Sequence, residues 1–344
     1  MLTAAAAVSL TLALPAIAQR DTDDDFPLRI DRVEIVGLDA ALGTILSARV
    51  GPDGQVYVTD HQSAQIVAFD PDGRLLWRSG RKGRGPGEFE MPYRVAVSAD
   101  RGVLVLDRAT SEVSALGPDG RFRQRYTLPV LFGQVDHMVA TPAGELLISG
   151  VTVARSDPRS ARYGIHRFSL RGQEMKWLGS FGPLPPVQDR QVLEHWGAGT
   201  LTPASGGDVL FSVRFPYAIH RFDASGRAKS VIRPSRPLQG KPEDAIIIEK
   251  VGASTIFSTG TREVLRPGPA WELPGGWTLA TRLSDRRLLW DLVSPAGTVS
   301  TRSLPENWKT VVGYDAARSL LWVTATENDE PVLLKVSVTL AGAK

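Results

Sequence analysis

Residues 51–60 read Gly-Pro-Asp-Gly-Gln-Val-Tyr-Val-Thr-Asp, a turn followed by a short strand-forming run that ends in aspartate. Residues 98–107, Ser-Ala-Asp-Arg-Gly-Val-Leu-Val-Leu-Asp, repeat this pattern. Similar passages, weaker toward the C-terminus, occupy residues 142–148, 206–211, 285–290 and 317–322. Self-similarity of this kind is typical of a repeat architecture, in which each repeat is one supersecondary unit.

A second turn follows each early copy and sets the length of the repeat. Its glycines are Gly73, Gly120, Gly172 and Gly226, and a late copy ends at Gly297. Asp-Gly and Pro-x-Gly sequences between apolar runs indicate hairpins, because glycine supplies the positive φ that such turns need. The glycines recur at intervals of about 50 residues, which four strands of roughly 5–6 residues and three turns would fill. This period is typical of a β-propeller blade.

The repeat predicts an all-β fold, a six-bladed β-propeller of four-stranded antiparallel blades, in a single domain over residues 31–340. The last blade contains only three clear strands, and we expect residues 32–36 to supply its fourth strand. Pairing the two ends of the chain would close the ring and hide two sheet edges that otherwise invite aggregation. The six blades are expected near residues 45–80, 92–128, 135–180, 198–233, 270–304 and 309–339.

Residues 235–268 do not follow the repeat. Pro242-Glu243-Asp244 precedes an apolar run and favours the start of a short helix, whereas the three isoleucines at 246–248 are equally compatible with a strand. We interpret this segment as an insertion, and a degenerate seventh blade is the alternative.

The composition of the 344 residues excludes several classes of protein. Apolar residues make up 42% and charged residues 22%, which is close to globular averages and excludes a disordered chain. The absence of cysteine excludes disulfides, thiolate metal sites and cysteine nucleophiles. The net charge is only +3 and the charges are interspersed, whereas nucleic-acid binding normally shows a clustered basic face. We therefore expect no nucleic-acid partner.

The N-terminal segment, residues 1–18, carries no charge and ends in Ala16-Ile17-Ala18. A short apolar stretch with this ending is typical of a secretory signal peptide, and the alternative is a membrane anchor. Pro15 and the shortness of the run favour cleavage after Ala18, which leaves residues 19–30 as a linker. We therefore expect an exported bacterial protein, periplasmic or extracellular, with no membrane span after signal cleavage.

Residues 80–97 resemble the linker of NHL repeats. A glycine-rich turn leads to Gly87-Glu88-Phe89, then to two further residues, Pro92 and an apolar strand. The next strand, which ends in Asp107, also matches that family, and the resemblance covers residues 50–125 before it fades. It implies the broad class of six-bladed NHL-like propellers, which includes binding scaffolds and a few enzymes, so the fold alone does not assign a function.

In propellers, ligands commonly sit at the central channel, where the starts of the inner strands converge. His137 starts the innermost strand of the third blade, and Arg94 takes the equivalent place in the second. A basic channel mouth of this kind would attract anionic groups, while a solvated mouth without a ligand is the alternative. The predicted ligand-binding residues are Arg94, His137, Tyr93, Asp136, Arg49 and Arg214.

Enzymes that resemble this class indicate which residues a metal site in this channel would need. The peptidyl-hydroxyglycine lyases place metal-binding histidines at inner strand starts, where this chain offers only His137, and Arg94 beside it would oppose a metal ion. The gluconolactonase-like hydrolases need a Glu and several Asn or Asp around calcium, whereas Asn occurs only at Asn307 and Asn328. Carboxylates could still bind Ca²⁺. We predict no metal and no cofactor.

Other notable residues have structural interpretations. Asp60 and Asp107 end equivalent strands, and we expect each to hydrogen-bond a neighbouring turn rather than to act in catalysis. The glycines of residues 83–87 precede a strand instead of a helix, which favours a linker over a phosphate-binding loop. Packing or surface roles are expected for His166 and His220. Packing roles are expected for Trp196, Trp271, Trp277 and Trp308, with an exposed binding surface as the alternative.

The leading hypothesis is an exported, monomeric binding module without catalytic activity. It would bind a protein, a peptide or a small anionic ligand across one face of the ring. The alternative is a metal-assisted lyase or hydrolase with its site at the central channel.

Overall fold

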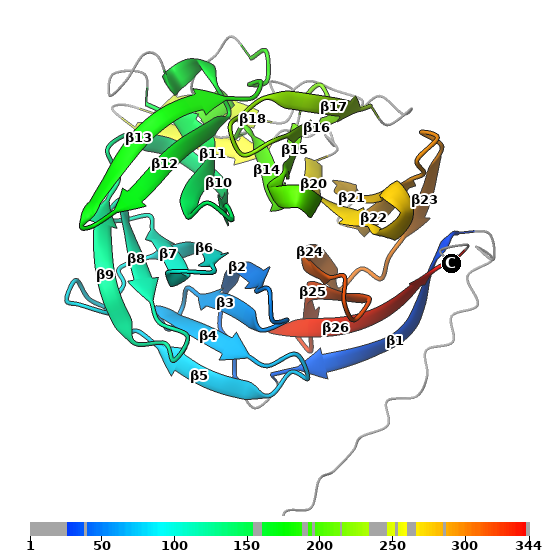
Figure 1. Cartoon of the computed structure of the whole chain (residues 1–344), viewed down its shortest axis with the longest axis horizontal. Helices are drawn as coiled ribbons and strands as arrows, with labels where there is room; N and C mark the ends of the chain where they lie inside the picture. The colour runs from blue at the N-terminus through cyan, green and yellow to red at the C-terminus, as the bar shows by residue number, and fades with distance from the viewer. Residues whose placement is uncertain are drawn as a thin grey trace, which may run out of the picture.

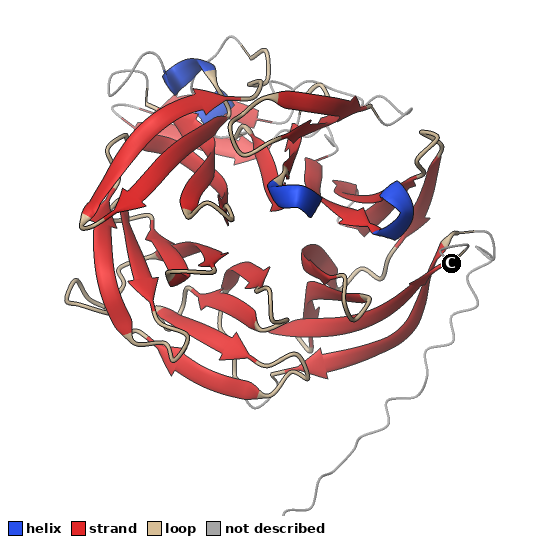
Figure 2. Ribbon diagram, in the orientation of Figure 1, coloured by secondary structure: helices blue, strands red, loops and turns tan. Residues whose placement is uncertain are grey.

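The computed structural model describes residues 26–37, 40–153, 160–187, 192–194, 197–213, 215–233, 246–251, 254–259, 266–284 and 287–341. Their strands form six antiparallel four-stranded sheets, arranged as blades around a central axis (Figure 1), and one separate two-stranded sheet. Helical structure among these residues is confined to short turns (Figure 2). The predicted all-β, six-bladed propeller is confirmed.

In the first three blades the strands follow chain order from the inner edge to the outer edge. Blade one contains β2 (Ile45–Val50), β3 (Val56–Asp60), β4 (Gln65–Phe69) and β5 (Leu75–Ser79). Blade two contains β6 (Pro92–Ser98), β7 (Gly102–Asp107), β8 (Glu112–Leu116) and β9 (Phe122–Thr127). Blade three contains β10 (Phe132–Ala140), β11 (Glu145–Thr152), β12 (Ile165–Arg171) and β13 (Glu174–Phe181), with the turn η2 (Ser160–Arg162) before β12.

The next two blades repeat this order, and each has a short 3-10 turn after its inner strand. Blade four contains β14 (Gly199–Pro203), η3 (Ser205–Gly207), β15 (Val209–Val213), β16 (Ala218–Phe222) and β17 (Ala228–Ile232). Blade five contains β20 (Arg266–Leu273), η4 (Pro274–Gly276), β21 (Trp277–Ser284), β22 (Arg287–Val293) and β23 (Val299–Ser303).

Blade six closes the ring with strands from both ends of the chain. It contains β24 (Trp308–Asp315), β25 (Leu320–Glu327), β26 (Glu330–Leu340) and, as its outermost strand, β1 (Leu28–Val36). β1 pairs antiparallel with β26, and the two lie side by side in blue and red in Figure 1. The predicted closure by the N-terminal strand therefore agrees with the structure. β1 begins at Leu28 rather than at the predicted Arg32, because Leu28 is buried in the apolar cluster between blades five and six.

The apolar core lies between neighbouring blades. The second strand of blade one, β3, is buried throughout, whereas its outermost strand, β5, has only exposed and half-buried residues. Between blades five and six, Trp271 and Trp308 are buried in one cluster and Trp277 packs against it. The predicted packing role is confirmed for these three tryptophans, while Trp196 lies outside the described residues.

Three of the five turn glycines of the repeat meet the outer strand of the preceding blade. Gly73 has a φ of +89°, and a Cβ atom there would lie 2.7 Å from Val36 of β1. Gly120 and Gly226 make the same approach, to Trp77 at 2.7 Å and to Phe181 at 2.6 Å. Glycine is therefore required at these turns both by the left-handed backbone and by the contact between blades.

The segment predicted to be an insertion contains a hairpin. β18 (Ile246–Val251) pairs antiparallel with β19 (Ser254–Thr259) in a sheet apart from the six blades. The three isoleucines thus belong to a strand rather than to a helix. β20 begins at Arg266, inside the segment assigned to the insertion, because the inner strand of blade five is longer than the repeat suggested.

Candidate functional site

The central channel is bounded by the inner strands of the blades. Five of the six predicted site residues lie on these strands, and hydrogen bonds link residues of different blades. These five residues are Arg49 near the end of β2, Tyr93 and Arg94 near the start of β6, and Asp136 and His137 within β10. The prediction that His137 starts its strand is wrong, because β10 already begins at Phe132. The sixth, Arg214, lies outside the described residues.

Arg49 reaches across the channel from blade one. Its Nη2 lies 2.8 Å from Nδ1 of His137 in blade three and donates to the carbonyl of Leu201 in blade four at 3.4 Å. Its Nη1 donates to the carbonyl of Ala48 at 3.1 Å. Because a guanidinium can only donate, Nδ1 of His137 accepts, which places the proton of the neutral ring on Nε2. One side chain thus connects three blades, two of which stand opposite each other in the ring.

The charge of Arg49 is buried. The residue is only 6% exposed, its Nε has no hydrogen-bond partner, and it forms no ion pair with any carboxylate in the described part of the chain. Burial, with a smaller contribution from the positive charge of Arg94, lowers the pKa of Arg49 to about 10. The guanidinium is therefore still protonated at neutral pH, and holding it away from water has a cost in free energy.

Arg94 joins the first three blades through backbone carbonyls. Its Nη1 donates to the carbonyls of Leu46 at 2.8 Å and Tyr93 at 3.2 Å, and its Nε donates to the carbonyl of Asp136. The guanidinium also lies 3.9 Å from the centre of the Tyr93 ring, a cation–π contact. These contacts orient Arg94 within the channel wall.

Asp136 holds the start of the inner strand of blade four. Its Oδ2 accepts hydrogen bonds from the backbone amides of Ala198 at 2.7 Å and Gly199 at 3.2 Å, where β14 begins. A Cβ atom at Gly197, whose φ is +83°, would lie 2.3 Å from Oδ1 of Asp136. The carboxylate therefore holds a tight inter-blade connection.

A cavity of about 500 Å³ opens where the inner strands end, at the opposite mouth from the strand starts singled out by the sequence. Arg49 is the predicted site residue that lines it. The rest of the lining comes mainly from small and aliphatic residues that sequence reasoning missed. They are Val50, Gly51, Pro52, Ala96, Val97, Ala99, Met138, Val139, Ala140, Thr141, Pro142, Pro203, Ala204, Gly207, Asp208, Val209, Tyr314, Asp315, Ala316 and Ala317. The available signal was the recurrence of Ala and Pro directly after the inner strands.

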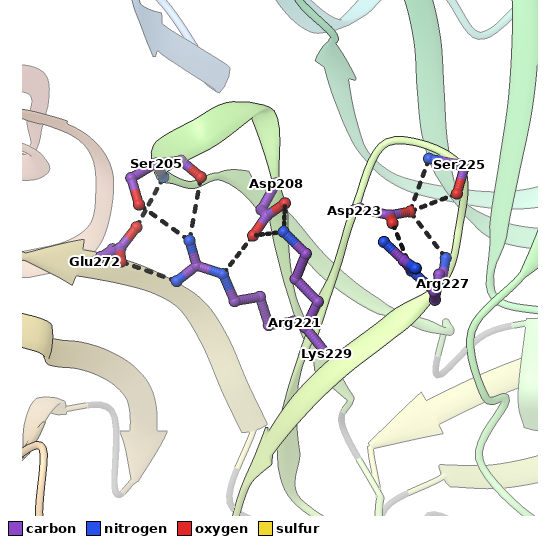
Figure 3. A network of polar contacts seen from close by, with 8 residues as sticks. All are labelled: Ser205, Asp208, Arg221, Asp223, Ser225, Arg227, Lys229 and Glu272. Carbon is purple, nitrogen blue, oxygen red and sulfur yellow. Dashed lines mark hydrogen bonds and ion pairs between the residues drawn. The ribbon is translucent and has the colours of Figure 1, made fainter.

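A polar network links Asp208, a cavity-lining residue of blade four, to Glu272 of blade five (Figure 3). Arg221 lies between two carboxylates, donating to Asp208 at 2.6 Å and to Glu272 at 2.8 Å. Lys229 contacts both oxygens of Asp208, at 2.7 and 2.9 Å. Burial acts to raise the pKa of Asp208, but the hydrogen bonds from Lys229 and Arg221 outweigh it and hold that pKa below its ordinary value. Asp208 is therefore an anion whose charge is already compensated.

The second carboxylate of the cavity wall is compensated as well. Oδ2 of Asp315 accepts from Nη1 of Arg318 at 2.8 Å, and its Oδ1 accepts from the amides of Ala317 and Arg318. Among the described lining residues, Arg49 is thus the charged side chain that lacks an oppositely charged partner.

Aspartates at the ends of equivalent strands organise turns, as expected. Asp60 accepts from the amides of Gln62, Ser63 and Gly43. Asp107 accepts from two amides of the turn that follows it and from two amides of the linker that precedes β6. The predicted structural role of both residues is confirmed.

The glycine-rich linker and the matching histidines also have structural roles. Glu88 accepts from the amide of Gly85 at 2.8 Å and from Arg81, so the loop is held by its own carboxylate. His166 is buried, with Nδ1 2.8 Å from Oγ of Ser180, and His220 stacks on Phe222. These residues belong to the packing of the blades.

The histidine set of the propeller lyases is not reproduced in the described residues. His137 contacts Arg49, with Arg94 nearby, so a cation at this place would meet two guanidinium groups. Among the residues that the structure describes, no group of three or more His, Asp or Glu side chains is arranged to hold a metal ion. His195 falls outside those residues.

No family model and no curated protein match the chain. Several solved structures share its fold. Virginiamycin B lyase from Staphylococcus aureus is 13% identical, with a TM-score of 0.53 over 91% of this chain and 100% of that one. A gluconolactonase from Xanthomonas campestris is 13% identical, with a TM-score of 0.51 over 91% and 97%. A Bacteroides fragilis protein whose name suggests export is 13% identical, with a TM-score of 0.56 over 91% and 96%.

These similarities establish the fold, a six-bladed β-propeller whose structural neighbours include enzymes. Identities this low do not transfer an activity, and the finer resemblance to NHL repeats stays a prediction. In the described part of the chain there is no helix with the length and apolar character that a membrane crossing requires.

Proposed function

We propose that this chain is a non-catalytic binding propeller that takes a small anionic ligand in the cavity beside Arg49. The observation that carries this proposal is a buried, protonated guanidinium without an ion-pair partner among the described residues, at the wall of a cavity. A cavity of about 500 Å³ falls within the range of roughly 300–1,000 Å³ typical of small-molecule sites. An anion placed there would offset the cost of burying the cation.

A concave site favours a small ligand over a protein that covers the whole face of the ring. Export would place this site in the periplasm or outside the cell. The uncharged segment that ends in Ala16-Ile17-Ala18 supports export. The name of the Bacteroides fragilis structural neighbour is in keeping with it. The mass of the mature protein, recovered from the producing cell, tests the predicted cleavage after Ala18.

Thermal unfolding in the presence of a panel of small anions tests the binding site. At constant ionic strength, phosphate, citrate and hexanoate would each be titrated into the wild-type protein, Arg49→Met and a control, Arg121→Met. Arg121 is 88% exposed at its side chain and does not line the cavity, so its replacement should change nothing. At least one anion should raise the unfolding temperature of the wild type and the control but not of Arg49→Met. Equal shifts in all three proteins, or no shift with any anion, would refute the proposal.

The alternative function is that of a metal-assisted lyase or hydrolase, because the chain shares its fold with a lyase and a lactonase. Metal analysis of the purified mature protein separates the two functions. Stoichiometric zinc or calcium would overturn the binding-module proposal, whereas metal at trace levels would leave it in place.

A further inference from the structure

The electrostatics of the cavity define what kind of anion it suits. Arg49 supplies one positive charge, and Asp208 and Asp315 are each compensated by their own basic partners. A ligand with two or three charges would bring further anionic groups close to these carboxylates, with no additional free cation among the described lining residues. The balance of charge therefore fits a ligand with a single negative group.

The remaining wall suits a hydrocarbon body. It is built largely from alanine, proline, valine and methionine side chains contributed by the ends of β2, β6, β10 and β14 and by the turns that follow them. Removing apolar ligand surface from water against such a wall is favourable. A purely hydrophilic anion would forgo that contribution.

From these two features we infer that the ligand is an amphiphilic monocarboxylic acid, with its carboxylate toward Arg49 and its apolar body against the alanine- and proline-rich wall. This inference rests on the proposed function and narrows it to one chemical class. A carboxylate oxygen accepts charge-assisted hydrogen bonds from a guanidinium, and the buried position of Arg49 strengthens that attraction. The apolar body would fill the rest of the cavity and exclude water from the ion pair.

Ligand-observed NMR titration with three matched probes tests the inference. Hexanoate carries one carboxylate and an aliphatic chain, hexanamide keeps the chain without the charge, and citrate carries several charges without an apolar body. Hexanoate should bind the wild-type protein, and both hexanamide and citrate should bind at least about tenfold more weakly.

Variants separate the two parts of the site. Arg49→Met should weaken hexanoate binding by at least about tenfold, and Arg121→Met should not change it. Ala140→Asp places a carboxylate in the wall while leaving Arg49 intact, and it should weaken hexanoate binding by a similar factor. Circular dichroism of each variant verifies that the ring is folded.

The outcomes distinguish this inference from the proposed function. Citrate or phosphate binding that depends on Arg49, with no binding of hexanoate, would refute the monocarboxylate class and leave the anion site standing. Hexanamide binding as tightly as hexanoate, or hexanoate binding unaffected by Arg49→Met, would also refute the inference. If none of the anions binds, both the inference and the proposed function are wrong.

Discussion

Replacing Arg49 by methionine is expected to stabilise the ring. Burial and the nearby Arg94 lower the pKa of Arg49 from 12.5 to about 10. This change corresponds to a cost of about 3 kcal/mol for holding the cation in the folded chain at neutral pH. Methionine is flexible, unbranched and uncharged, so it can occupy much of the same space without that cost.

The hydrogen bonds lost with the guanidinium are partly replaced. Nδ1 of His137 lies 3.1 Å from the carbonyl of Leu201. Once Arg49 is gone, the His137 proton can move to Nδ1 and be donated to this carbonyl. The carbonyl of Ala48 then loses its hydrogen-bond donor, which lowers the free energy of unfolding by about 1 kcal/mol. The expected net gain in the free energy of unfolding is therefore about 2 kcal/mol.

Urea unfolding followed by tryptophan fluorescence measures this gain. Arg49→Lys is the matched control, because it keeps a buried charge and should give no stabilisation. A methionine variant no more stable than the wild type would refute the reasoning, and so would a lysine variant that gains as much.

The gain should also depend on pH with a definite sign. Because the folded-state pKa of Arg49 is lowered, the cost of its charge is complete below about pH 10 and is relieved as the pH rises toward 12.5. The difference between Arg49→Met and the wild type should therefore be constant around neutral pH and should shrink above about pH 10.

Three further predictions concern the scaffold. Asp107→Ala removes the acceptor of four backbone amides and should lower the free energy of unfolding by about 2–4 kcal/mol in urea, whereas Asp72→Ala on an exposed turn should change it little. A chain that starts at Gly37 lacks β1 and should aggregate or unfold at a much lower temperature in light-scattering and thermal measurements, whereas one that starts at Phe26 should match the full chain. Burial, with a smaller contribution from the negative charge of Asp53, raises the pKa of Tyr57 to about 12. The stability that depends on the protonated phenol is therefore present below pH 10 and is lost as the pH rises toward 12. Tyr57→Phe should remove one late-ionising phenol from an ultraviolet titration, and an unchanged titration would contradict the assignment.

The blades were predictable because the signals that specify them are local. A turn with glycine at positive φ, followed by a short apolar strand, identifies each hairpin wherever it occurs, as at Gly73 and Gly120. The missing strand of the last blade was predictable because only three of the four strands that a blade needs were found there. The start of β1 was not, because Leu28 joins the strand through packing against residues near the other end of the chain.

The candidate site was only partly predictable. The convergence of Arg94 and His137 on the channel follows from the repeat, since they take equivalent positions on inner strands that face the same axis. Arg49 lies two residues beyond the equivalent position in blade one and contacts His137 through its long side chain. Which mouth of the central channel holds the cavity depends on how far individual side chains extend from the inner strands. Arg94 donates to the carbonyls of Leu46 and Asp136, contacts between residues more than 40 positions apart, and such pairings leave no local trace in the sequence.

The closing pair of strands imposes an order of events on a chain that is made from its N-terminus. β1 ends at Val36, and its partner β26 is complete only at Leu340. At synthesis rates of roughly 5–20 residues per second, β1 waits for about 15–60 seconds before its partner exists. Throughout that interval its apolar residues and its unpaired edge are exposed, whichever blades have already formed. The nascent chain therefore exposes this strand until its synthesis is nearly complete, and a helper that shields it would act longer than one that shields any later hairpin.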